Sequence, residues 1–287
     1  CDGANGSTTF IDGAKGRVCA PVGNAQISNL QSEFGGTSAL FDGVGDSILI
    51  TSSTDFNFST TDWTVECWAR FAAVPANYSL INIGTYGSSG ITLILQADNN
   101  LSLMANATNN YTAWTPVNNT WYHIAAVKTS NKIKLFVDGS QLGSDFADTQ
   151  NLNPNTNTHI GSIQDGTTYA MSGNIDEVRL SKGIARWTAD FTPPTSAYAS
   201  EGYLTINTNT DLAFTNSDYT IETCVYFDKF VTTGSESTLV AKYDTGLNKR
   251  SWNLSIGTTG TNQTLNYYFS PNGTAFTQTA YNLGILA

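Results

Sequence analysis

The sequence predicts an all-β protein, a two-layer sandwich or jelly roll followed by a second, incomplete copy of the same fold. Short apolar runs alternate with polar residues at the two-residue period of strands, and no useful length of chain shows the 3.6-residue period of a helix. Turn-forming Gly, Asn, Ser and Asp-Gly separate these runs at short intervals. Part of the pattern then recurs at a constant distance along the chain. Many short strands with frequent turns are typical of a sandwich.

After a Gly-, Ser- and Asn-rich lead-in at 1–38, the predicted strands follow one another with polar turns between them. In the strand at 62–71, Val65 and Cys67 fall on one face, whereas Glu66 and Trp68 fall on the other. The segment 131–143 is predicted to be a hairpin, because Asp138-Gly139 favours a type I′ turn between alternating apolar residues. The remaining predicted strands are 39–42, 47–50, 80–83, 91–95, 101–104, 121–128, 159–163 and 174–180.

The closing strand at 174–180 and the basic turn after it are predicted to complete the first domain at 1–195. The chain after Trp187 is punctuated by Pro193 and Pro194, a linker is assigned to 196–200, and the pattern then restarts. Asp55 recurs as Asp211 and Phe71 as Phe227, both at an offset of 156 residues. The second copy, 201–287, lacks counterparts of the hairpin and the closing strand. We therefore expect a piece of a longer protein, or a second copy that another chain completes.

Composition and charge exclude several classes of partner. The chain has 287 residues, with 13 Lys and Arg against 23 Asp and Glu, and a net charge of −10. Such a chain does not neutralise a phosphate backbone or an anionic membrane surface, so no nucleic-acid partner is predicted. No apolar run approaches the roughly 18 residues of a membrane span, so no membrane insertion is predicted.

The four cysteines indicate no zinc site, because none belongs to a C-x-x-C pair. They are Cys1, Cys19, Cys67 and Cys224. Cys1 and Cys19 could bridge the lead-in in an oxidising compartment. The favoured alternative is that all four are free thiols packed as small hydrophobic side chains.

The stretch 39–187 resembles a laminin G-like jelly roll of the concanavalin A-like superfamily. The motifs that carry the resemblance are Leu-Phe-Asp-Gly at 40–43, Trp-Thr-Val-Glu-Cys-Trp at 63–68, Trp-Tyr-His at 121–123, Phe-Val-Asp-Gly at 136–139 and Ile-Asp-Glu-Val-Arg at 175–179. The lead-in also resembles that of tandem-repeat bacteriophage virion and tail proteins.

These resemblances imply a non-enzymatic structural or adhesion protein at a virion surface or outside the cell, of the phage tail or capsid-decorating type. Its implied partners are other virion proteins or copies of itself, together with host cell-surface glycans. The alternative is a carbohydrate-binding module of a secreted bacterial adhesin or of a glycan-degrading enzyme.

Aromatic residues in or beside predicted loops are the candidate ligand site, because exposed rings stack on the faces of sugars. They are Tyr78, Tyr86, Tyr111 and Trp114. The alternative is that they are loop anchors or contacts between subunits.

Calcium is the one cofactor considered, because pentraxin-like relatives of this fold bind it through a Gln-Asp pair. Gln164-Asp165 follows Ile160-Gly161 in a comparable place. One carboxylate and one amide fall short of the roughly six to eight oxygens that calcium takes, so an ordinary turn is the alternative.

No catalytic group is predicted. His123 and His159 both lie in predicted strands, where a packed histidine is more common than a catalytic one. Asp176 and Glu177 are adjacent, so strand alternation directs them to opposite faces, away from the paired geometry of glycoside hydrolysis. Glu66 is interpreted as a solvated strand residue or as a partner of an arginine, Arg70 or Arg179.

Overall fold

The computed structural model describes residues 3–164, 166, 168–198, 236–244, 249–259, 262–269 and 277–282. The chain divides into two compact units, Cys1–Tyr203 and Leu204–Ala287. The first half of the predicted repeat, 204–227, lies outside the described residues. The domain limits predicted from the sequence, with a linker at 196–200, stay a prediction.

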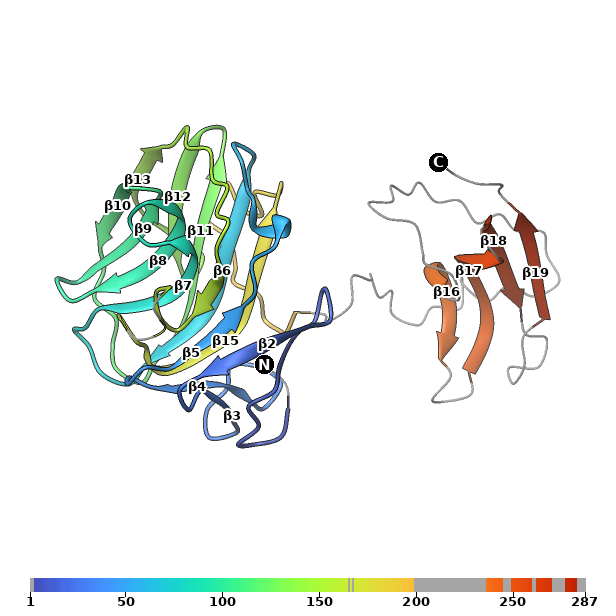
Figure 1. The fold of residues 1–287 in the computed structure, drawn as a ribbon, viewed down its shortest axis with the longest axis horizontal. Helices are drawn as coiled ribbons and strands as arrows, with labels where there is room; N and C mark the ends of the chain where they lie inside the picture. The colour runs from blue at the N-terminus through green and yellow to red at the C-terminus, as the bar shows by residue number, and fades with distance from the viewer. Residues whose placement is uncertain are drawn as a thin grey trace. The chain divides into compact units, whose positions relative to one another are not determined.

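The described part of the first unit is a sandwich of two antiparallel sheets, which confirms the predicted fold class (Figure 1). A single 3-10 turn, η1 (Thr54–Phe56), interrupts the strands. The eight-stranded sheet has the order β1 (Phe10–Asp12), β2 (Arg17–Val22), β5 (Ser47–Ile50), β14 (Thr158–Ile160), β7 (Tyr78–Thr85), β8 (Ser89–Gln96), β9 (Asn100–Ala105), β10 (Thr108–Ala113). The seven-stranded sheet has the order β13 (Ser140–Ala147), β12 (Lys132–Val137), β11 (Trp121–Thr129), β6 (Trp63–Phe71), β15 (Ser172–Lys182), β4 (Ser38–Asp42), β3 (Gln26–Ser28).

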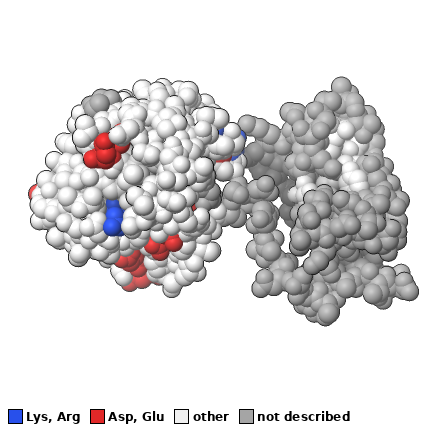
Figure 2. Space-filling model, turned by 90° about the horizontal axis from the view of Figure 1, so that it is seen from below, with Lys and Arg blue, Asp and Glu red and all other residues white. Residues whose placement is uncertain are grey.

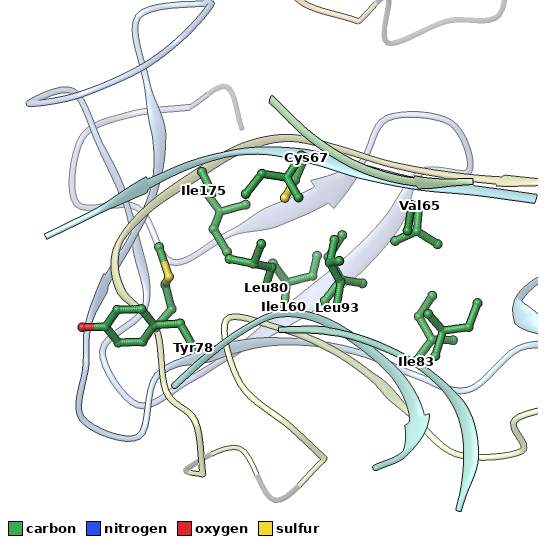
Figure 3. Close-up of a cluster of buried hydrophobic side chains, with 14 of the residues drawn as sticks. Val65, Cys67, Tyr78, Leu80, Ile83, Leu93, Ile160 and Ile175 are labelled. Carbon is green, nitrogen blue, oxygen red and sulfur yellow. The ribbon is translucent and has the colours of Figure 1, made fainter. Parts of the chain in front are cut away.

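The core lies between the two sheets, as the alternation in β6 predicted. Val65 and Cys67 of the seven-stranded sheet point toward Leu80 and Leu93 of the other sheet (Figure 3). These side chains are fully buried. Burying each large aliphatic side chain stabilises the fold by about 1.5–3 kcal/mol, so this layer is the main source of stability.

The opposite face of β6 is also buried, which the sequence did not predict. Glu66 is fully buried and Trp68 nearly so. Part of the cover comes from the lead-in, where Phe34 packs edge-on against Trp68 at a centroid distance of 5.7 Å. The interpretation of Glu66 as a solvated residue is therefore wrong, and its alternative, a partner of Arg179, is confirmed below.

The closing strand, β15, lies inside the seven-stranded sheet between β6 and β4. Its register with β6 shifts between Asp176 and Arg179, and Glu177 has a φ of 47°. This bulge breaks the simple alternation on which the opposite-face prediction for Asp176 and Glu177 rested. Asp176 accepts hydrogen bonds from the backbone N–H groups of Glu33 and Phe34, at 3.2 and 3.3 Å.

The described part of the second unit is an antiparallel sheet in the order β16 (Glu236–Asp244), β17 (Lys249–Thr259), β18 (Asn262–Phe269), β19 (Thr277–Asn282). Trp252 and Ile256 of β17 are its buried apolar residues.

The first unit exposes little charge on the face seen in Figure 2, where isolated acidic and basic groups interrupt a mostly uncharged surface. None of the helices in the described residues is long and apolar enough to cross a membrane. Cys19 and Cys67 are buried free thiols, whereas Cys1 and Cys224 lie outside the described residues. Burial raises the pKa of the Cys67 thiol far above its usual value, so this thiol stays protonated.

Candidate functional site

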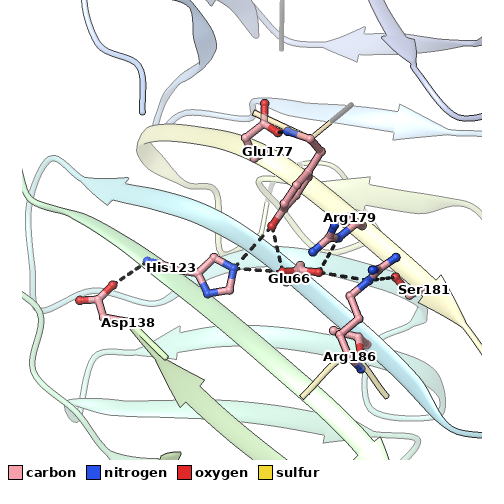
Figure 4. Close-up of polar contacts among 9 residues, drawn as sticks. Glu66, His123, Asp138, Glu177, Arg179, Ser181 and Arg186 are labelled. Carbon is pink, nitrogen blue, oxygen red and sulfur yellow. Dashed lines mark hydrogen bonds and ion pairs between the residues drawn. The ribbon is translucent and has the colours of Figure 1, made fainter. Parts of the chain in front are cut away.

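A buried carboxylate, that of Glu66 in β6, organises a polar cluster on the outer face of the seven-stranded sheet (Figure 4). Arg179 of β15 stands opposite Glu66 in the strand register, and its Nε donates to Glu66 Oε1 at 2.6 Å. Glu66 Oε2 lies 3.0 Å from His123 Nε2 of β11 and accepts a hydrogen bond of 2.9 Å from the Tyr198 hydroxyl. Arg186 Nε lies 3.7 Å from Glu66 Oε1. We call these five residues the Glu66 cluster.

The surroundings of Glu66 and Tyr198 shift the pKa values of both groups. Burial by itself would raise the pKa of Glu66, but hydrogen bonds from His123 and Arg179 and the charge of Arg179 outweigh it and leave the pKa below its usual 4.5. Burial, with the Glu66 charge beside it, raises the pKa of Tyr198 far above its usual value. Glu66 is therefore a fixed anion and Tyr198 a fixed neutral donor.

The segment 184–198, which we call the covering segment, closes this face of the sheet. Trp187 and Phe191 stack on each other at 3.9 Å, and both rings stand edge-on to His123. The Phe191 N–H donates to the carbonyl of Gly139 at 2.9 Å. The Arg179 guanidinium lies over the Tyr198 ring, 3.7 Å from its centroid. The cluster and the covering segment thus hold each other in place.

Truncating Phe191 to alanine is expected to lower the free energy of unfolding by about 1–3 kcal/mol, because a half-buried ring loses its contacts with Trp187 and Phe136. Urea denaturation followed by tryptophan fluorescence measures this change. Ile184→Ala is the control, since Ile184 lies in the same segment with 48% of its surface exposed. Equal losses in the two variants would contradict a role for Phe191 in anchoring the segment.

Two of the predicted ligand-binding aromatics are packed into the protein. Tyr78 is 7% exposed, stacks on Phe71 at 6.1 Å and donates its hydroxyl to the Ala73 carbonyl at 2.9 Å. Trp114 is half-buried and stands edge-on to Tyr122 at 5.1 Å. The ring of Tyr78 is not free to stack on a sugar, and both residues have the packing of loop anchors, the alternative considered above.

The structure brings together two other predicted residues, Tyr86 and Gln164. The backbone N–H of Tyr86 donates to Gln164 Oε1 at 2.8 Å. Tyr169, which the sequence analysis missed, stands edge-on to Tyr86 with ring centroids 5.6 Å apart. Burial and a hydrogen bond with Tyr169 raise the pKa of Tyr86. Both tyrosines are partly exposed, and we call the three residues the Tyr86 site.

Tyr111 lies elsewhere, on the edge strand β10, with 56% of its surface exposed. The predicted calcium ligand Asp165 lies outside the described residues. In the described part of the chain, no three His, Cys, Asp or Glu residues are grouped so as to hold a metal ion. The calcium site stays a prediction.

The strands that position the Glu66 cluster and the Tyr86 site belong to a shared family region. A laminin G model, described as the concanavalin A-like lectin/glucanases superfamily, matches residues 42–186. The chain belongs to this superfamily. The matched region includes Glu66, His123, Arg179 and the Tyr86 site, whereas the lead-in and Tyr198 fall outside it. No curated protein matches the sequence.

The chain is also similar to several solved structures. Domain 4 of AbnA, a GH43 extracellular arabinanase from Geobacillus stearothermophilus, in complex with arabinotriose, is 18% identical, with a TM-score of 0.45 over 56% of this chain and 76% of that one. Trypanosoma rangeli sialidase in complex with sialic acid is 17% identical, with a TM-score of 0.48 over 63% of this chain and only 29% of its own length. A putative carbohydrate binding protein from Bacteroides ovatus is 17% identical, with a TM-score of 0.42 over 59% of this chain and 53% of that one.

Proposed function

We propose that this chain is a non-catalytic glycan-binding part of a larger protein, and that it holds its ligand at the Tyr86 site. The observation that carries the proposal is the convergence of two partly exposed tyrosines and an exposed glutamine amide from two loops, β7–β8 and β14–β15. Membership of a superfamily of lectins and glucanases supports it.

The chemistry of the Tyr86 site suits a sugar. Partly exposed aromatic rings offer an apolar surface to the C–H face of a pyranose, and phenol hydroxyls both donate and accept hydrogen bonds. Gln164 uses its carbonyl oxygen on the Tyr86 N–H. Its amide nitrogen has no partner among the described residues, so it is a donor for a ligand hydroxyl.

The absence of catalysis is part of the proposal, and the state of the buried carboxylate supports it. A glycosidase acid needs a raised pKa and access to the scissile bond. Glu66 has a lowered pKa and is fully buried beneath Tyr198 and the two arginines.

For the setting we propose the surface of a virion, where glycan recognition would attach a phage tail or capsid to its host. The alternative setting is a secreted bacterial adhesin or enzyme, in which the same domain would hold the protein on a glycan. Either setting uses the Tyr86 site in the same way.

A glycan array probed with the full chain tests the proposal. We expect selective retention on a small set of glycans, and a loss of affinity of about tenfold or more in Tyr86→Ala and in Tyr169→Ala, because each ring contributes stacking surface. Tyr111→Ala is the matched control and is expected to bind as the wild type does. The array is run with added calcium and with a chelator, and binding in the calcium arm alone would show that ligand binding requires the cation. No retained glycan in either arm, or an equal loss in Tyr111→Ala, would contradict the proposal.

A further inference from the structure

The first unit contains a cavity of about 640 Å³ between its two sheets, apart from the Tyr86 site. Its walls come from the β1–β2 hairpin and β5 on one side, and from β3, β4 and β15 on the other. Ligand sites for small molecules have volumes of about 300–1,000 Å³, so this cavity is of a size that holds a ligand.

The cavity exists because the seven-stranded sheet is incomplete beside the second half of β15. Strand β4 pairs with β15 only from Ser172 to Ile175. Beyond the bulge, from Arg179 to Lys182, β15 pairs with β6 and with no other strand among the described residues. The β1–β2 hairpin of the other sheet bridges the space that this open strand edge leaves.

The walls of the cavity are mostly apolar. Phe10, Ile48 and Ile175 are buried, and Val178 and Leu180 of the open edge are half-buried. Protein interiors are packed as closely as organic crystals and contain few voids larger than a water molecule. An apolar space of this size is therefore suited to an apolar occupant rather than to solvent.

The lining of the cavity carries charges of both signs: the carboxylates of Asp12, Asp55 and Glu177, and the cationic groups of Lys15, Arg17, Arg179 and Lys182. Arg17 is paired with Asp55 and lies 3.8 Å from Asp12, and Arg179 is paired with Glu66. Lys15 and Lys182 also line the cavity, and neither has a carboxylate partner among the described residues. Lys182 Nζ donates instead to the Thr54 carbonyl at 3.1 Å.

Lys15 and Lys182 are both exposed and both line the cavity, so they add positive charge to its lining in a chain with a net charge of −10. An anion held between them would gain two charge-assisted contacts without displacing a carboxylate. An apolar body attached to that anion would fill the space beneath.

We propose that this cavity binds an amphipathic anion, a long-chain carboxylate, with its chain against Val178 and Leu180 and its carboxylate between Lys15 and Lys182. The β1–β2 hairpin, one wall of the cavity, lies before residue 42 and so outside the matched family region. The proposal is independent of glycan binding at the Tyr86 site.

Titration of the full chain with cis-parinaric acid, a fluorescent fatty acid, tests the proposal. We expect saturable binding of one probe per chain, displaced by oleic acid at least about tenfold more effectively than by oleyl alcohol. Leu180→Trp, which fills the cavity, is expected to abolish binding. The double variant Lys15→Glu, Lys182→Glu alters exposed side chains only, and is expected to weaken binding of the acid by about tenfold while binding of the alcohol is unchanged. Lys132→Glu, an exposed lysine of the hairpin β12–β13, is the control and should bind as the wild type does.

Three results would overturn the proposal. The first is no saturable binding by the wild-type chain. The second is equal binding of the acid by the wild type and by the charge-reversed variant, once a circular dichroism spectrum has shown that the variant is folded. The third is a chain that binds no probe but forms a concentration-dependent dimer, with the dimer abolished by Leu180→Trp. That result would make the cavity an interface between copies of the chain.

Discussion

Glu66→Ala is expected to lower the free energy of unfolding of the first unit by about 3–5 kcal/mol, because removal of one partner from a buried ion pair leaves the others uncompensated. Arg179, His123 and Tyr198 all lose their shared acceptor. The covering segment loses its attachment through Tyr198 at the same time. Urea denaturation of the full chain, followed by tryptophan fluorescence, measures the loss.

Glu66→Gln separates the charge from the shape of this side chain. The amide keeps one acceptor oxygen for the cluster, so a smaller loss is expected, of about 1–3 kcal/mol. A loss in Glu66→Ala no larger than that of an exposed substitution would contradict the anchoring role.

The pH dependence of stability gives a second test of Glu66. Its pKa in the folded chain lies below the usual 4.5, so the unfolded chain binds more protons than the folded chain in acid. The contribution of Glu66 is therefore complete above about pH 4.5 and is lost as the pH falls through the folded-state pKa. Stability measured at a series of acidic pH values should fall less steeply in Glu66→Gln than in the wild type. Parallel curves for the two proteins would contradict the ionised state assigned to Glu66.

Gly173→Ala is expected to cost about 4 kcal/mol or more, since the substitution combines backbone strain with a steric clash. Gly173 has a φ of 140°, and a Cβ there would stand 2.0 Å from the carbonyl oxygen of Arg70 in the neighbouring strand. The clash is with backbone, so it is relieved only by separating β15 from β6. Thermal unfolding and the yield of folded protein measure the effect.

Gly183→Ala is the matched control at the other end of β15. Gly183 also has a positive φ, 76°, but a Cβ there would meet nothing within 4 Å. We expect a loss of about 1–2 kcal/mol from the backbone alone. Similar losses of stability at the two glycines would show that the close approach of β15 to β6 at Gly173 does not add to the cost of the substitution.

The sequence was informative wherever a residue's environment follows from its neighbours along the chain. The alternation in 62–71 correctly assigned Val65 and Cys67 to the core. The Asp138-Gly139 pair marked the hairpin of β12 and β13, whose turn the structure places between Val137 and Ser140. The same logic failed for the outer face of β6, because its cover comes from outside the strand: from Phe34 in the lead-in and from the covering segment, more than a hundred residues after Glu66.

The candidate sites show the same limit. Tyr86 and Gln164 were selected for different reasons, and nothing in their spacing indicated that they touch. Tyr169 carried no signal beyond its place in a turn-rich loop. Tyr78 was selected on the same ground as Tyr86, as an aromatic residue in or beside a predicted loop, but tertiary packing buried its ring against Phe71.

By itself, the sequence determined the all-β class and the inward face of the central strands, because a two-residue period is set by local backbone geometry. Only the tertiary structure decided that Glu66 is a buried anion, that the Tyr86 site forms, and that a cavity opens beside β15. The physical reason is that these features depend on strand order, on the bulge in β15 and on the return of the covering segment. Each of these brings together residues that are remote in sequence, and contacts of that kind leave no local pattern in a single chain.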